Sequence, residues 1–395
     1  MKIIATAQPI GFGPVSNLVT LLQDCQEEVE YFGFGTCYEF LNELKQNPFF
    51  IRKEKEFEDT LSVLTQKKYD LLISVMGSKS AILAKKLGIP VLYLDLVFWM
   101  WEDLNSFDYY KKKADSLPII SLEELKNKYF FYEGQNDEMR KETSILSHFI
   151  SDKSLVQEFI PCEGTNKQII DILPNSEQTL PLMNDSLGRL SSNKGNQNAL
   201  LFSLGGLQVQ NDYRFVIRDL LSLVQAEEKI EVIGSKEHLA PIQSKLLNTY
   251  NYLNKVSQYQ IVFAQPGFST LYELMHLNVI PIILPAQNIG QLKFVHFLKK
   301  YLNNSQFIEW EDIYPNRKEN LVDYVTELNC FMKKDNKLSA KLYKKLKIVQ
   351  DYVEHNTLSI LEQQQKFLAQ RESELPSAKV ALNNFIKTLK YRTVQ

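Results

Sequence analysis

The sequence is poor in cysteine and lacks a long hydrophobic run, and both features exclude classes of protein. Its 395 residues include four scattered cysteines without a C-x-x-C pair, namely Cys25, Cys37, Cys162 and Cys330. This spacing argues against a structural zinc site and a disulfide framework, and it favours a reducing compartment. No window reaches the ~20 apolar residues of a membrane span, and Pro9 and Gly11 interrupt the first apolar run too early for a signal peptide. We therefore expect a cytoplasmic protein without an integral membrane segment.

The sequence also lacks an excess of charge of one sign. Lys and Arg together number 45 and Asp and Glu together number 47, which gives a formal net charge of -2. Such a balance produces no overall field that would attract nucleic acid or an anionic membrane. We expect no nucleic-acid partner, and the sequence does not indicate an oligomeric state.

The chain is too long for one ordinary core, since a domain takes on the order of 150 residues. Residues 1–184 are expected to form one α/β domain and residues 199–375 a second one. Between them, residues 185–198 (DSLGRLSSNKGNQN) are small, polar and without periodicity, which is typical of a linker. Pro376 sets off residues 376–395, which we expect to form a C-terminal helix that packs back on the first domain.

The first domain opens with a short apolar strand and a glycine-bearing turn. Gly11 and Gly13 permit tight backbone there, but Ser16 occupies the third glycine position of a dinucleotide-binding fingerprint. Bound NAD is therefore not expected, and no cofactor is predicted. Residues 70–95 then read as strand, helix and strand, with a turn at Gly77 and Ser78, as in a doubly wound sheet.

Aromatic residues become dense after this unit. Trp99 and Trp101 are two of the three tryptophans of the chain and lie within three residues of each other. One interpretation is a hydrophobic packing cluster. The other is a cleft wall on which a ring or an apolar acceptor stacks.

The second domain restarts the pattern with a buried strand that ends at Gly205 and Gly206. Its most informative segment is 260–291 (QIVFAQPGFSTLYELMHLNVIPIILPAQNIGQ), which reads as strand, turn, amphipathic helix, strand and polar loop. In a parallel sheet such a turn lies at the ligand-binding edge, and the first turn of the helix attracts phosphate. Gly267 permits close approach of a ligand, while Ser269 and Thr270 supply hydroxyl groups.

Glu273 follows Thr270 by three residues and admits two interpretations. It is placed to accept hydrogen bonds from the hydroxyl groups of a sugar. Alternatively, Thr270 and Glu273 form a T-x-x-E capping box, in which the threonine caps the helix and the glutamate bonds back to it. A capping box alone does not explain the strand and the polar loop that continue to Gln291, so this continuation favours the first interpretation.

Three segments together resemble the GT-B nucleotide-sugar glycosyltransferases: GFGPVSNLVTLL, SLGGL and AQPGFSTLYELMHLNVIPIILPAQNIGQ. The relevant branch includes the UDP-glycosyltransferases and the peptidoglycan N-acetylglucosaminyltransferase. The resemblance implies an α/β fold of two Rossmann-like doubly wound domains that face each other across a cleft. It implies that Glu273 bonds the ribose, that Gln291 contacts the donor sugar and that Gly267, Ser269 and Thr270 bind the diphosphate. Gly205, Gly206 and Phe268 are expected to belong to the same donor site.

The chain departs from the family pattern at the catalytic position. The family often has a histidine general base after the first strand, where this chain has Pro14, and Gly290 replaces the aspartate before the glutamine. The combination of G-F-G-P with D-L-x-F-W-M-W is similar to cytosylglucuronate synthase-type enzymes. Fold and donor site therefore carry over better than the catalytic groups.

Asp95 is the candidate base, because it ends a strand at the edge that faces the donor. The alternative is that Asp95 caps the turn after it. Each histidine, including His148, is expected to be a surface or packing residue. The acceptor is expected near Gly11, Gly13, Pro14, Ser78, Trp99 and Trp101.

The resulting prediction is a metal-independent glycosyltransferase with a UDP-sugar as co-substrate and a small-molecule or lipid-linked acceptor. In this mechanism helix N-termini and backbone N–H groups meet the charge of the leaving diphosphate. Two alternatives stay open, a nucleotide-sugar epimerase on the same fold and a non-catalytic GT-B-like partner subunit.

Overall fold

The chain divides into two compact units. The computed structural model describes all residues except 10–11, 102–103, 131–136, 159, 162–163, 174, 184–198, 205–212, 235–238, 240, 246, 248, 315–327, 331, 333–334, 336 and 395. Unit 1 comprises Met1–Leu182 and Leu375–Gln395, and unit 2 comprises Met183–Glu374. The expected domain limits at 184 and 376 stand close to these boundaries, and the expected linker 185–198 lies outside the described residues.

Unit 1 contains a parallel sheet in the order β3-β2-β1-β4-β5-β6-β7. Its strands are β1 (Lys2–Ala7), β2 (Glu28–Gly33), β3 (Phe49–Phe50), β4 (Leu71–Val75), β5 (Val91–Asp95), β6 (Lys153–Gln157) and β7 (Ser176–Thr179). The apolar runs 71–75 and 91–95 are buried throughout, as strands covered on both faces require. The chain moves outward from β1 to β3 and then returns to β4 beside β1, so the strand order reverses between β1 and β4.

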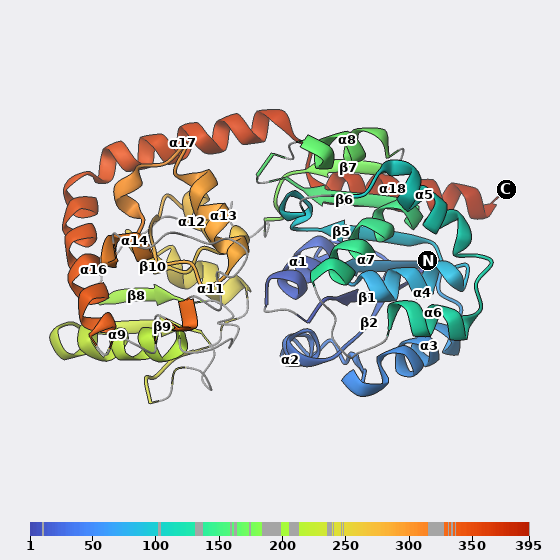
Figure 1. Cartoon of the computed structure of the whole chain (residues 1–395), viewed down its shortest axis with the longest axis horizontal. Coiled ribbons are helices and arrows are strands. Elements are labelled where there is room, and N and C mark those ends of the chain that lie inside the picture. Colours follow the sequence, from blue (N-terminus) through green and yellow to red (C-terminus); the bar gives the residue numbers. More distant parts are fainter. Residues whose placement is uncertain are drawn as a thin grey trace. The chain divides into compact units, whose positions relative to one another are not determined.

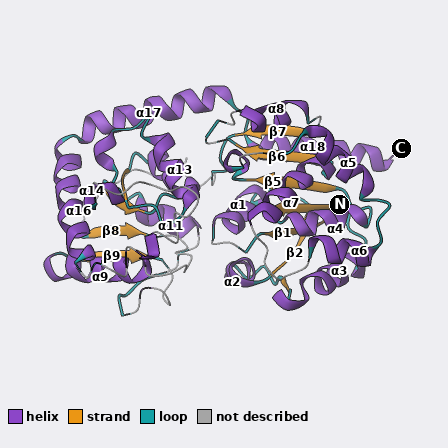
Figure 2. Cartoon of the chain, viewed as in Figure 1, coloured by secondary structure: helices purple, strands orange, loops and turns teal. Residues whose placement is uncertain are grey.

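Helices cover both faces of this sheet (Figure 2). They are α1 (Gly13–Leu22), α2 (Gly35–Glu43), α3 (Glu56–Gln66), α4 (Ser78–Lys86), α5 (Phe107–Ser116), α6 (Leu122–Tyr129), α7 (Asp137–Ile150), α8 (Gly164–Ile172) and α18 (Ala378–Val394), with the short 3-10 helices η1 (Lys53–Lys55) and η2 (Phe98–Met100). One core lies between the sheet and α1, α2 and α18, and a second lies between the sheet and α3, α4, α6 and α7.

The C-terminal helix α18 belongs to unit 1 (Figure 1). Its buried side chains, among them Leu382 and Ile386, share a core with Ile3 and Leu18. Just before the helix, Leu180 and Ser377 form a parallel bridge. Residues from the two ends of the chain therefore complete one core.

Unit 2 contains a smaller parallel sheet in the order β11-β10-β8-β9. Its strands are β8 (Leu200–Ser203), β9 (Ile230–Ile233), β10 (Ile261–Ala264) and β11 (Ile280–Ile283). The helices in the described part of this unit are α9 (Tyr213–Glu227), α11 (Thr249–Val256), α12 (Phe268–His276), α13 (Ile289–Leu298), α14 (Trp310–Ile313), α16 (Leu338–His355) and α17 (Thr357–Glu374), with the 3-10 helix η4 (Asn304–Gln306). Here the strand order reverses between β8 and β10, so the expected doubly wound α/β architecture is confirmed in both units.

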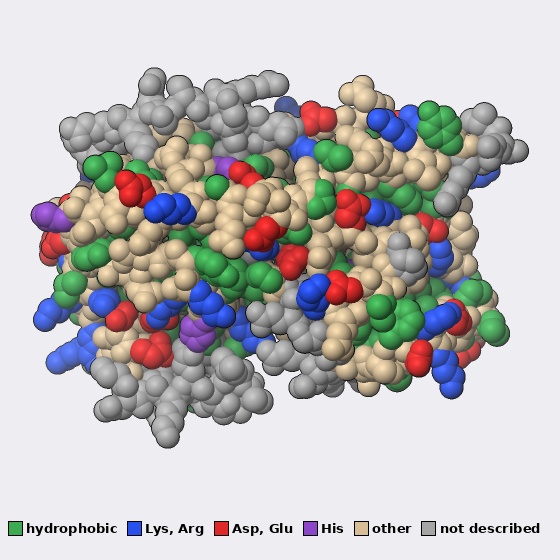
Figure 3. All heavy atoms as spheres, turned by 90° about the horizontal axis from the view of Figure 1, so that it is seen from above, with side chains coloured by type: hydrophobic (Ala, Val, Ile, Leu, Met, Phe, Trp, Pro, Cys, Tyr) green, Lys and Arg blue, Asp and Glu red, His purple; other side chains and the backbone are tan. Residues whose placement is uncertain are grey.

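The surface shows the balance of charge that the composition predicts. On the face shown in Figure 3, Lys and Arg side chains lie interspersed with Asp and Glu side chains, in keeping with the formal net charge of -2. No helix in the described part of the chain has both the length and the apolar character required to cross a membrane.

Candidate functional site

The turn between β10 and α12 lies where the strand order of unit 2 reverses. Gly267 is the N-cap of α12, with φ -101, a conformation open to any residue. A Cβ atom on Gly267 would meet nothing closer than the Thr270 hydroxyl at 3.6 Å. Neither the backbone nor the neighbouring atoms therefore require glycine here. The first turn of the helix carries N–H groups of the kind that bind anions.

The capping-box interpretation of this helix is wrong. The helix begins at Phe268, so Thr270 lies inside its first turn and Glu273 in its second. No side chain caps the N-terminus. The Thr270 hydroxyl instead hydrogen-bonds the hydroxyl of Tyr252 on α11, which also receives a hydrogen bond of 3.3 Å from Ser203 at the end of β8.

Glu273 is a buried carboxyl group without a hydrogen-bond donor among the described residues. It is 6% exposed. Burial raises its pKa to about 8. A buried polar group of this kind is costly unless it is satisfied, since an unmade hydrogen bond costs ~1–3 kcal/mol. The position therefore suits an external donor such as a hydroxyl group.

The polar groups around this turn include residues that the sequence motifs did not single out. Gln265 is 4% exposed, and its amide nitrogen donates to the hydroxyl of Tyr213, which donates to the carbonyl of Pro285 at 2.8 Å. The side-chain oxygen of Gln265 has no hydrogen-bond partner among the described residues. The only sequence feature that indicates a role for Gln265 is its place directly before Pro266 in the motif. No sequence feature indicates a role for Tyr252, because only the packing of α11 brings it to the site.

Gln291 lies in the first turn of α13, and Phe268 packs against that helix. The side-chain oxygen of Gln291 accepts from the backbone of Gln287 at 2.9 Å, and its backbone N–H donates to Asn288 at 2.9 Å. No described residue accepts from its side-chain nitrogen, so that group is the part available to a ligand. The ring of Phe268 stacks on Phe294 with centroids 4.1 Å apart.

Two of the expected glycine turns lie partly or wholly outside the described residues: Gly205 and Gly206, and Gly11. Gly13 is described and begins α1, and a Cβ atom there would find no atom within 4 Å. Pro14 is buried in the first turn of α1.

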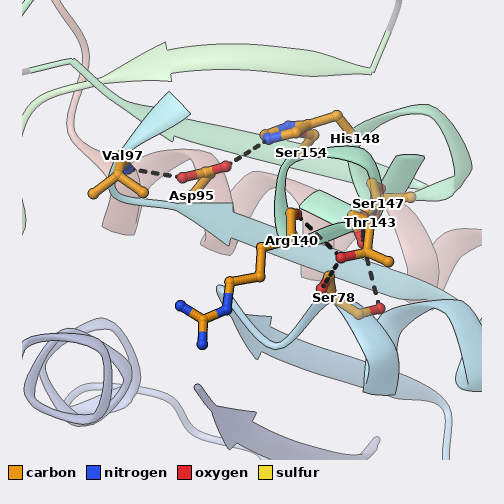
Figure 4. Close-up of polar contacts among 9 residues, drawn as sticks. Ser78, Asp95, Val97, Arg140, Thr143, Ser147, His148 and Ser154 are labelled. Carbon is orange, nitrogen blue, oxygen red and sulfur yellow. Dashed lines mark hydrogen bonds and ion pairs between the residues drawn. The ribbon is translucent and has the colours of Figure 1, made fainter. Parts of the chain in front are cut away.

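Asp95 is almost fully buried at the end of β5. It is 1% exposed, and its two carboxylate oxygens accept from the backbone of Val97 at 2.7 Å and from His148 at 3.0 Å (Figure 4). The other ring nitrogen of His148 contacts Ser154, and the ring lies against Tyr93 and Phe98. The hydrogen bond from Val97 is the contact expected if Asp95 caps the turn that follows β5, which was the alternative to its role as a base. The role of Asp95 as a base stays a prediction.

The expected acceptor residues do not all line the same cavity. Trp99 and Trp101 lie against an aromatic and aliphatic cluster that includes Phe98 and Tyr110. Ser78, the first residue of α4, lines a cavity of about 330 Å³ in unit 1 whose lining does not include Gly13, Pro14 or either tryptophan. Contact of those residues with an acceptor stays a prediction.

The fold resembles that of known sugar-transferring enzymes. The spinosyn rhamnosyltransferase SpnG superimposes with a TM-score of 0.51 and 10% sequence identity, over 99% of this chain and 100% of that one. Its complex with thymidine diphosphate gives a TM-score of 0.53 at 10% identity, and its complex with spinosyn aglycone gives 0.50 at 10% identity, each over 98% of this chain and 100% of that one. No family model matches this sequence. No curated protein sequence matches it either. The similarity establishes the fold, and the chain has the two-domain GT-B architecture that its sequence predicts.

Proposed function

We propose that the protein is a glycosyltransferase that moves a sugar from a nucleotide donor, with UDP as the expected nucleotide, to a small-molecule or lipid-linked acceptor. The observation that carries this proposal is Glu273, a buried carboxyl group in the second turn of α12, for which no described residue supplies a donor. A nucleotide fits both this carboxyl group and the N-terminus of the helix. Its diphosphate suits the helix N-terminus, and its ribose hydroxyls suit the carboxyl group.

The donor half of the reaction requires the leaving diphosphate to be held as charge develops on it. The N–H groups of the first turn of α12 and the hydroxyl of Ser269 would stabilise that charge, so the reaction is proposed to proceed without a bound metal ion. The side-chain nitrogen of Gln291 would donate to the sugar. A nucleoside diphosphate is also the ligand with which the spinosyn rhamnosyltransferase was solved.

The acceptor half of the reaction requires a proton to leave the attacking group. Pro14 offers no base, and Asp95 has both oxygens engaged. An acceptor that is already acidic, or that attacks through a ring nitrogen, needs little base catalysis. We propose that the acceptor is of this kind.

Binding of UDP to the full-length chain tests the donor site. UDP is expected to raise the melting temperature, and Glu273→Ala is expected to reduce the stabilisation by ~1–3 kcal/mol because the hydrogen bonds to the ribose are lost. Glu362→Ala, which removes an exposed carboxyl group of unit 2, is the matched control and should respond like the wild type. The same measurement is made with thymidine diphosphate, to test whether the site prefers another nucleotide. The donor-site assignment fails if no nucleoside diphosphate shifts the melting temperature.

A non-catalytic partner subunit is the second candidate, because Pro14 replaces the base and Asp95 is buried. Mass spectrometry of the protein incubated with UDP-glucose, UDP-glucuronate or UDP-N-acetylglucosamine and a metabolite extract separates the two. A glycosylated product supports the transferase. UDP binding with neither transfer nor donor hydrolysis supports the partner subunit.

A further inference from the structure

A cavity of about 330 Å³ lies at the carboxyl edge of the unit 1 sheet. Its walls include the end of β1 at Ala7, the β2–α2 turn at Gly35 and the β4–α4 turn at Gly77. These turns flank the point between β1 and β4 where the strand order reverses, which is where open α/β sheets bind ligands. Its volume is near the lower limit of small-molecule sites, ~300–1,000 Å³. The cavity therefore suits one small molecule or the head of a larger one.

The cavity is lined with hydroxyl groups held in place by hydrogen bonds between two helices. Ser78 on α4 donates to the hydroxyl of Thr143 on α7 at 3.1 Å, and Thr143 donates to the carbonyl of Arg140 at 3.1 Å (Figure 4). One turn further along α7, the hydroxyl of Ser147 contacts the carbonyls of Thr143 at 2.8 Å and of Ser78 at 3.4 Å. These bonds fix the start of α4, and the residues of its first turn, Ser78 to Ser80, line the cavity.

The charged side chains of the lining are mostly cationic. Among the described lining residues, Lys53, Lys79 and Arg140 come from three different elements, and Glu56 is the one carboxylate. Lys79 forms an ion pair of 2.8 Å with Glu56, and both side chains are largely buried, at 12% and 15% exposure. This pair neutralises the carboxylate. A cation-rich cavity is a local feature, because the chain as a whole has a formal net charge of -2.

Arg140 on α7 is the one arginine among the described residues of the lining. Its side chain extends away from the contact between Thr143 and Ser78 (Figure 4), and the residue belongs to the lining of the cavity. A guanidinium group recognises phosphate or carboxylate through two parallel hydrogen bonds. The N-terminus of α4 and the nearby hydroxyl groups add donors for the same charge.

We propose that this cavity binds the anionic group, a phosphate or a carboxylate, of the molecule that accepts the sugar. The identification of the anion as part of the acceptor rests on the proposed function, whereas anion binding itself does not. An anionic group narrows the expected acceptor, a small-molecule or lipid-linked compound, to one that carries negative charge. Trp99 and Trp101 are absent from the lining, so the described cavity offers charge and hydroxyl groups instead of an indole surface for an apolar acceptor.

Calorimetric titration of the full-length chain with inorganic phosphate and with acetate, at constant ionic strength, tests the inference and separates the two anions. The wild type is expected to bind at least one of them. Arg140→Gln is expected to weaken binding about tenfold, and Lys53→Gln in the same direction, because charge-assisted hydrogen bonds are lost. Both residues are exposed, so the variants should fold. Lys112→Gln removes an exposed cation on α5 outside the cavity and should leave binding unchanged.

The inference is overturned if neither anion binds, or if Lys112→Gln weakens binding as much as Arg140→Gln does. UDP titration of the same preparations keeps this result apart from the donor site. UDP binding that depends on Glu273, without anion binding that depends on Arg140, leaves the proposed function standing and removes the charged acceptor. The reverse result supports the anion site and removes the proposed function.

Discussion

Glu273 links the donor site to pH. Its pKa lies near 4.5 in an unfolded chain and is raised to about 8 by burial. Between these values the folded protein holds a proton that the unfolded chain releases, so stability falls as pH rises through this window. The loss of stability caused by the buried, ionised carboxylate is complete above about pH 8 and is absent below about pH 4.5.

Glu273→Gln removes this dependence because the amide does not ionise. The variant is expected to be more stable than the wild type by a few kcal/mol, in order of magnitude, above pH ~8, and the difference should disappear near pH ~4.5. Urea denaturation across this range measures it, with Glu362→Gln as the exposed control. Parallel stability curves for wild type and Glu273→Gln would show that the carboxyl group is not desolvated.

Asp95 illustrates how one residue can be located correctly while its role stays open. Its place at the end of a buried strand follows from the apolar run before it. Its partner His148 is 53 positions away in the sequence. No local pattern indicates that pairing, because it depends on α7 packing over β5 and β6.

Asp95→Asn separates the two roles. If Asp95 caps the turn, as its contacts indicate, the variant should lose ~1–3 kcal/mol of unfolding free energy while transfer per folded molecule is retained. If Asp95 is the base, transfer should fall by ~10²–10⁴-fold with little change in stability. Denaturation and initial rates are measured on the same preparation. Asp115→Asn, on an exposed part of α5, is the control.

At the scale of elements, helix α12 shows where sequence patterns reach their limit. Two overlapping signals, Pro266-Gly267 and Thr270-x-x-Glu273, predict different starting points for this helix. The structure selects the first, since Gly267 is the N-cap. The strands were easier to predict, because runs such as 280–283 are buried on both faces and leave few alternatives. The polar partners of the turn, Tyr252 and Gln265, required the tertiary fold.

Helix α18 provides a test of packing energy in unit 1. Leu382 is 1% exposed and lies in the core beside Ile3, whereas Val380 on the same helix is 56% exposed. Leu382→Ala is expected to lower the unfolding free energy by ~2–5 kcal/mol, and Val380→Ala to change it little. Urea denaturation of both variants measures the difference. Equal effects would mean that α18 does not dock as described.

At the scale of the molecule, the three tryptophans report on different units. Trp310 is 2% exposed in the core of unit 2 and donates to the carbonyl of Ala286 at 3.0 Å, whereas Trp99 and Trp101 lie in unit 1. A variant with Trp99→Phe and Trp101→Phe therefore keeps one reporter, which follows unit 2.

UDP is expected to raise the urea midpoint of the Trp310 fluorescence transition, because it binds the folded state of unit 2. Acetate should leave that midpoint unchanged, since the proposed anion site is in unit 1 and the donor site is proposed to hold a diphosphate. Fluorescence recorded with each ligand at constant ionic strength makes the comparison. An equal shift with acetate would place the anion site in unit 2 instead.

The shared core of β1 and α18 has a consequence for synthesis of the protein. Unit 1 contains the first residues of the chain and residues beyond 374, with all of unit 2 between them. On the ribosome, unit 2 can therefore finish folding while the face of the first sheet that α18 covers is still incomplete. At this stage of synthesis the apolar face of the sheet is exposed, and the chain has its greatest need of a chaperone.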